Sequence, residues 1–129
     1  MRKLANGIVI ISLLGLAYVA LLAWWSPQQV MDLVHLEIPN PDAASSIRGV
    51  YGSVGLFVCL VLGYLWKQDL ALSLRFLALF WLLYALARVV TWKSHGPLGE
   101  FGTTWLGIES TFGILSLFLS KYPSVKSSA

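Results

Sequence analysis

Three ionisable side chains lie within or at the edge of otherwise apolar segments of this chain: Arg48, Arg88 and Glu109. A charge inside hydrocarbon costs roughly 3 kcal/mol on insertion scales, so such residues usually face the interior of a helix bundle and find partners. Arginine offers a planar fork of donors that suits a carboxylate or phosphate, and a glutamate can orient that fork or carry a proton. The three residues therefore predict a polar site inside an apolar protein.

The spacing of two of these charges from tryptophans indicates their depth. Arg88 lies four residues before Trp92, and Glu109 lies four residues after Trp105. Because tryptophans gather at membrane–water interfaces, each charge should lie roughly 6 Å inward from the same outer interface. Equal depth makes an ion pair between Arg88 and Glu109 the expected arrangement.

Arg48 lies at the start of another apolar segment, residues 47–63. On a regular helical wheel it shares one face with residues that are small or polar-tipped. Small residues let neighbouring helices approach closely in lipid, so we expect this face to pack against other helices and Arg48 to point inward. The other members of the face are Tyr51, Gly52, Gly55, Cys59 and Gly63.

Three hypotheses account for the charges. In the first, Arg88 and Glu109 pair to set helix register while Arg48 extends to the outer headgroups. In the second, two arginines against one carboxylate leave a net positive, outward-facing pocket that binds the anionic head of an amphipathic lipid-like ligand. In the third, Glu109 carries protons, as in small multidrug transporters, although those have their essential glutamate in the first helix and this chain does not. The candidate ligand-binding residues are Arg48, Tyr51, Tyr84, Arg88, Trp92, Trp105 and Glu109.

The composition is that of a membrane protein. Of the 129 residues, 57% are hydrophobic and only 12% are charged, and the mean hydropathy is +0.74, which is too apolar for a soluble domain of this size. The single cysteine, Cys59, excludes an internal disulfide and a CxxC redox pair. The net charge of +3 is spread along the chain, so no nucleic-acid partner is predicted.

The apolar segments predict an all-α, integral membrane four-helix bundle in a single domain, residues 1–129. Helices are expected over residues 4–25, from about 41 to 66, from 70 to about 92, and from a start between 98 and 104 to about 120. The first has the length of a retained span and lacks a small-x-small cleavage site, which argues against a signal peptide. The predicted N-caps are Asn40, followed by Pro41 and Asp42, and Asp69; the predicted stop is Gly96 with Pro97.

A short interfacial helix is expected between the first two spans. Ser26 and Pro27 are suitable for its N-cap and first position, and Val30, Leu33 and Val34 would form its apolar side. At the other end of the chain, the tail from Ser124 to Ala129 is expected to be frayed.

Lysine and arginine are distributed asymmetrically between the two sides of the bundle. The N-terminus, the connection at Lys67 and the tail after Ser120 carry most of them, whereas residues 26–46 carry none. The positive-inside rule then predicts a multi-pass membrane protein with both termini in the cytoplasm.

Catalysis and metal binding have little support in the sequence. His35 and His95 lie in predicted outer loops and could join Asp32, Glu37 or Glu100 as metal ligands, but the spacing does not place three ligands on one helical face. No nucleophile lies near a general base. We therefore predict no catalytic residue, no metal and no cofactor, and lean towards a protein that is not an enzyme.

The segment IPNPDAASSIRGVYGSVGLF, followed by a helix with Ala87 and Arg88 and another with Glu109, resembles a family of small bacterial four-helix membrane proteins catalogued only as a domain of unknown function. Members often have two glycines after the tyrosine, where this chain has Gly52 and Ser53. The overall pattern is distantly similar to DoxX-like four-helix proteins, some of which are thought to assist assembly of other membrane proteins.

Residues and resemblance together predict a non-enzymatic, multi-pass protein of the bacterial inner membrane. It would bind an amphipathic anionic lipid-like ligand, or assist assembly of a membrane partner, through an outward Arg/Glu/Tyr pocket. The alternative is a small proton-coupled transporter that uses Glu109. The expected partners are membrane lipids and either another membrane protein or a second copy of the chain.

Overall fold

The computed structural model describes residues 1–126, and within that range every regular element is a helix. Three segments are long and apolar enough to cross a membrane: α1 (Arg2–Trp25), the stretch Pro41–Gln68, and α5 (Leu70–His95). The helix α6 (Glu100–Leu119) has 20 residues but is more polar and falls outside this set. The predicted all-helical class and membrane character are confirmed at this level.

The chain divides into two compact units. The first, here called the hairpin unit, comprises residues 1–9 and 65–129, of which the structure describes those up to 126. The second, here called the N-terminal unit, comprises residues 10–64.

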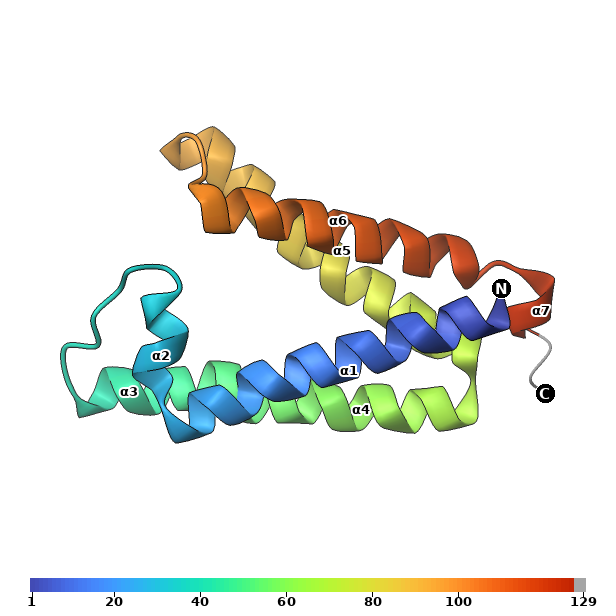
Figure 1. Ribbon diagram of the computed structural model, residues 1–129, viewed down its shortest axis with the longest axis horizontal. Helices are drawn as coiled ribbons and strands as arrows, with labels where there is room; N and C mark the ends of the chain where they lie inside the picture. Colours follow the sequence, from blue (N-terminus) through green and yellow to red (C-terminus); the bar gives the residue numbers. More distant parts are fainter. Residues whose placement is uncertain (127–129) are drawn as a thin grey trace. The chain divides into compact units, whose positions relative to one another are not determined.

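The hairpin unit is built on α5 and α6, which lie side by side and run in opposite directions (Figure 1). Asp69 begins α5 because its carboxylate accepts hydrogen bonds from the backbone N–H groups of Ala71, at 2.8 Å, and Leu72, at 3.2 Å. Gly96 ends it with φ of 99°, a left-handed conformation that glycine adopts without strain. Both predicted boundary residues are confirmed, and Glu100 begins α6 within the predicted interval.

Close packing of α5 against α6 depends on a small residue. A Cβ atom at Gly113 would lie 2.7 Å from the side chain of Leu82 and 3.3 Å from its backbone nitrogen. A larger residue would push the helices apart, so glycine permits the approach. The start of α1 also belongs to this unit, where the Trp66 indole donates a hydrogen bond to Asn6 Oδ1 at 2.8 Å.

The tail does not follow its prediction as far as the structure describes it. Residues Pro123–Lys126 form a short helix, α7, with Val125 buried, and α7 lies against α5. The expectation of fraying is therefore wrong for residues 124–126, because Val125 gains burial there. Residues 127–129 lie outside the described part of the chain.

The N-terminal unit pairs residues 10–25 of α1 with the segment that follows Pro41 (Figure 1). A Cβ at Gly55 would lie 2.9 Å from Ala20 Cβ, and one at Gly52 would lie 2.5 Å from Cδ1 of Trp24. The predicted small-residue contact is confirmed at these two glycines. It is wrong at Gly63, where a Cβ would meet nothing within 4 Å.

The second predicted helix is not one regular α-helix. It consists of α3 (Pro41–Ile47), a π-helical segment η1 (Arg48–Ser53) and α4 (Val54–Gln68). Asn40 caps it as predicted, accepting a hydrogen bond from Ala43 N at 2.9 Å. The wider turn of η1 shifts the helical phase between Arg48 and Gly55, so a single 100° wheel misplaces residues across it.

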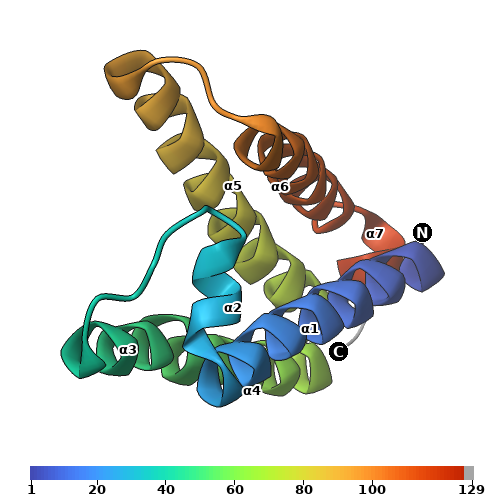
Figure 2. The same cartoon turned by 60° about the vertical axis from the view of Figure 1, so that its left-hand side comes forward.

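The connection between α1 and α3 contains the predicted short helix, α2 (Pro27–Asp32), which is visible in Figure 2. Ser26 precedes it but makes no side-chain capping hydrogen bond. The predicted apolar side is partly wrong, because Leu33 and Val34 lie beyond α2 and are exposed. The cluster that forms instead comprises Ala23, Val30 and Met31, with Leu22, Ile38 and Ile47 packed against it.

The loop after α2 is held by one glutamine. Gln28 Nε2 donates to Asp32 Oδ1 at 2.6 Å and to the Leu36 carbonyl at 3.0 Å. Its Oε1 accepts from Ile38 N at 3.0 Å. These bonds bridge ten residues and explain how a loop rich in exposed side chains keeps a defined path.

Candidate functional site

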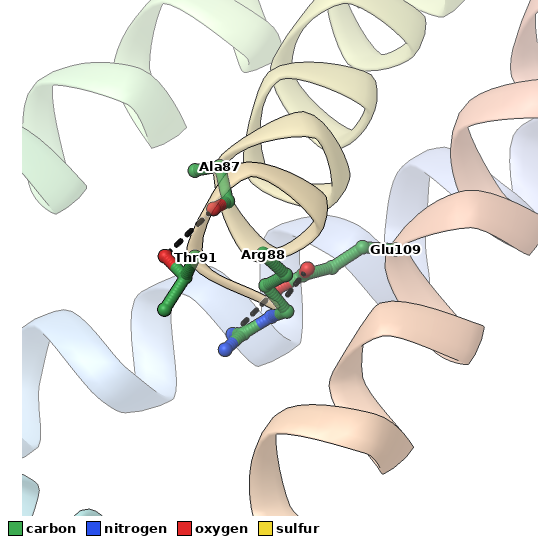
Figure 3. A network of polar contacts seen from close by, with 4 residues as sticks. All are labelled: Ala87, Arg88, Thr91 and Glu109. Carbon is green, nitrogen blue, oxygen red and sulfur yellow. Dashed lines mark hydrogen bonds and ion pairs between the residues drawn. The ribbon is translucent and has the colours of Figure 1, made fainter. Parts of the chain in front are cut away.

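The hairpin unit holds a two-point ion pair between Arg88 of α5 and Glu109 of α6 (Figure 3). Arg88 Nε donates to Glu109 Oε2 at 2.7 Å, and Arg88 Nη2 donates to Oε1 at 2.8 Å. This fork-to-fork geometry combines charge attraction with two hydrogen bonds, the strongest arrangement open to these groups. The ion pair expected from equal depth is confirmed.

The two partners differ in their access to the surroundings. The Glu109 side chain is 2% exposed, whereas that of Arg88 is 23% exposed. Glu109 takes the Nε–H and one Nη2–H, and Arg88 makes no other hydrogen bond to the described residues. The outer edge of the guanidinium therefore keeps three N–H donors, two on Nη1 and one on Nη2.

An aromatic ring lies beside the guanidinium group. Arg88 Cζ is 5.8 Å from the ring centroid of Phe101, within cation–π range. Phe101 in turn lies near Trp105, with ring centroids 6.1 Å apart. The orientation of the Arg88 side chain is therefore restricted by the Phe101 ring and by the buried Glu109 carboxylate.

Deeper in the hairpin, the face of α6 that carries Glu109 is lined with small and polar residues. Gly113, Ser116 and Ser120 are buried along it. Ser120 Oγ donates to the carbonyl of Leu117 at 2.7 Å. Ser116 Oγ is buried and has no hydrogen-bond partner among the described residues. This face is polar beyond what helix packing alone requires.

The other predicted site residues are placed less closely around the ion pair. Tyr84 is exposed and has its ring centroid 5.0 Å from that of Phe80. Trp92 is exposed at the far end of α5. Arg48 and Tyr51 belong to the N-terminal unit, so a single pocket shared with Arg88 and Glu109 stays a prediction.

The predicted inward direction of Arg48 is only partly correct. Arg48 Nε donates to the Trp24 carbonyl at the end of α1, at 3.1 Å, so the side chain does reach a neighbouring helix. The residue is nevertheless exposed.

Phe101 is a site residue that the spacing of charges and tryptophans did not predict. It lies in the first turn of α6, eight residues before Glu109, close to two helical turns and therefore on a similar side. That relation depends on knowing that α6 already begins at Glu100. Among residues 1–126, no group of three or more His, Cys, Asp or Glu is close enough to hold a metal ion.

Together these features define a protein that is all-helical over residues 1–126, with three segments long and apolar enough to cross a membrane and an oriented arginine in a helical hairpin. The chain belongs to the family described as Domain of unknown function (DUF4345), whose model matches residues 4–120. This confirms the resemblance to a family catalogued only as a domain of unknown function. Neither a curated protein nor a solved structure matches the chain.

Proposed function

We propose that this protein is a non-enzymatic binding protein of the bacterial inner membrane whose Arg88 takes the anionic head of an amphipathic lipid-like ligand. One observation carries the proposal: Glu109 occupies the inner edge of the guanidinium and leaves its outer edge with free donors. A carboxylate or phosphate oxygen at that edge would receive charge-assisted hydrogen bonds, and the acyl tail would lie along the apolar hairpin.

The membrane arrangement belongs to the same proposal. We place α1, the Pro41–Gln68 segment, α5 and α6 as four spans, with both termini in the cytoplasm and the connection between α5 and α6 on the outer side. The count of lysine and arginine on each side supports this orientation. Arg88 then lies near the outer interface, where a ligand head can reach it from the water.

Assembly assistance is compatible with the same chemistry, because the carboxylate of a partner membrane protein could occupy the same edge of Arg88. Proton carriage through Glu109 is less favoured, since both carboxylate oxygens accept hydrogen bonds from Arg88. A carrier would have to break this pair in each cycle, and removing a partner from a buried pair is costly.

Native mass spectrometry of the detergent-purified protein with added palmitate tests the proposal. The informative variant is Arg88→Lys, which keeps the charge but replaces the planar fork with a point charge. Arg75→Lys is the matched control, because Arg75 is exposed on the same helix. We expect palmitate retention to fall about tenfold in Arg88→Lys and to stay unchanged in Arg75→Lys.

Equal retention by the wild type and Arg88→Lys would contradict ligand binding at this arginine and leave the ion pair a purely structural feature. Proteoliposomes with an imposed pH gradient separate the carrier hypothesis. Proton flux that is lost in Glu109→Gln would favour a carrier, whereas palmitate binding without flux favours a binding protein.

A further inference from the structure

The N-terminal unit contains a second arginine with unused donors. Arg48 gives only its Nε–H to the Trp24 carbonyl, and it makes no other hydrogen bond or ion pair with the described residues. Both Nη groups, with four N–H donors, therefore have no partner among the described residues, and Arg48 is exposed. The two Nη groups form one edge of the guanidinium, and arginine can bind two oxygens of a phosphate through such an edge.

The local backbone holds this guanidinium in place. A Cβ at Gly52 would clash with the Trp24 indole at 2.5 Å, so the indole lies directly against η1. The π-helical turn Arg48–Ser53 brings Arg48 and Gly52 to the same tryptophan at the end of α1. Anchoring at one nitrogen lowers the entropy cost of binding through the other two.

The position along α1 places Arg48 at headgroup level. From Arg2 to Trp25 the helix has 24 residues, or about 36 Å, enough to cross the hydrocarbon core. The exposed Trp24 and Trp25 mark the end of that span, where amphipathic indoles prefer the interface. A side chain that contacts Trp24 therefore lies among lipid phosphates.

The charge of this unit favours a headgroup that is not acidic overall. Arg48 is the only lysine or arginine among residues 10–64, which also contain Asp32, Glu37 and Asp42. This excess of carboxylates over basic groups disfavours a lipid with net negative charge, whereas a zwitterionic phospholipid carries an ammonium group beside its phosphate. A zwitterionic headgroup can therefore offer its phosphate to Arg48 without adding net negative charge to the unit.

We infer that Arg48 is a binding site for the phosphodiester of a zwitterionic phospholipid, independent of the ligand at Arg88. Its two Nη groups donate to two phosphate oxygens while Nε stays on Trp24. The bound lipid thereby fixes the depth of this end of the protein.

Retention of added phosphatidylethanolamine in native mass spectrometry tests the inference, with diacylglycerol of the same acyl chains as the ligand that lacks a phosphate. The variant is Arg48→Gln, because the glutamine amide can still donate to the Trp24 carbonyl and so preserve the cap on α1. Arg75→Gln removes an equal charge from another exposed position. We expect Arg48→Gln to lose phosphatidylethanolamine at least about tenfold, with diacylglycerol unchanged and Arg75→Gln like the wild type.

Three results would overturn the inference: phospholipid retention unchanged in Arg48→Gln, equal retention of diacylglycerol and phospholipid by the wild type, or tighter binding of phosphatidylglycerol than of phosphatidylethanolamine. Competition by millimolar inorganic phosphate would reassign the site to a soluble anion. If Arg48→Gln melts early, Arg48→Lys serves instead, and weaker phospholipid retention at an unchanged melting temperature supports the inference. Palmitate retention should be normal in both Arg48 variants, which separates this site from the one at Arg88.

Discussion

At the scale of single residues, the Arg88–Glu109 pair links two helices through groups that would each be costly alone. Glu109 is almost fully buried, and its only hydrogen-bond donors among the described residues are on Arg88. Removing either partner leaves the other charge without compensation in a poorly screening medium, whereas removing both leaves two apolar surfaces.

The pair should therefore behave as a coupled unit. Arg88→Leu or Glu109→Leu alone is expected to lower the free energy of unfolding by about 3 kcal/mol, and the double variant should recover much of that loss. Chemical denaturation in detergent, followed by circular dichroism, measures the three differences. Additive losses in the double variant would show that the two side chains do not stabilise each other.

Ser116 provides the opposite case at the same scale. Its buried hydroxyl has no hydrogen-bond partner among residues 1–126, so it contributes a desolvation cost without a compensating bond. Ser116→Ala should leave stability unchanged or raise it by about 1 kcal/mol. Ser73→Ala is the control, because Ser73 Oγ is buried and donates to the Leu70 carbonyl at 2.8 Å. A loss in Ser116→Ala larger than in Ser73→Ala would indicate a partner, such as a bound water, at Ser116.

At the scale of elements, the N-terminal unit depends on close approach between α1 and the Pro41–Gln68 segment. Gly55 lies against Ala20, whereas Gly63, two helical turns further along α4, has open space around its Cα. The same substitution at the two positions therefore separates helix contact from the general effect of a glycine in a helix.

Gly55→Leu is expected to destabilise the protein by about 1–3 kcal/mol, since the side chain must displace α1. Gly63→Leu should be neutral or slightly stabilising, because leucine is the better helix former. Melting of the two variants in the same detergent gives the comparison. Similar melting temperatures would show that the contact between Gly55 and Ala20 does not contribute to stability.

At the scale of the whole molecule, orientation in the membrane decides which water phase each site faces. The basic residues near Arg2, Lys67 and Lys121 favour the cytoplasm for both termini. A reporter enzyme that is active only in the periplasm should therefore be inactive when fused after Lys126 and active when inserted near Pro97. The reverse pattern would turn the Arg88 edge and Arg48 towards the cytoplasm.

Much of the local structure follows from residue types. Asn40, Asp69 and Gly96 mark helix ends in the sequence and in the structure, because a capping carboxamide or carboxylate and a left-handed glycine act within a few residues. The Arg88–Glu109 pair was also predictable, since each of the two residues lies four positions from a tryptophan, and this spacing predicted equal depth.

The tertiary structure alone decided what depends on neighbours far along the chain. The π-helical turn Arg48–Ser53 has no signature in local preference, and the contact between Gly52 and Trp24 joins residues far apart in the sequence. Phe101 beside Arg88, and Met31 in place of Leu33 in the core of the N-terminal unit, likewise follow from packing. Sequence by itself determined which residues are charged, apolar or helix-ending, because those properties are local. The fold decided which of these residues meet, because contact energies depend on partners that periodicity does not specify.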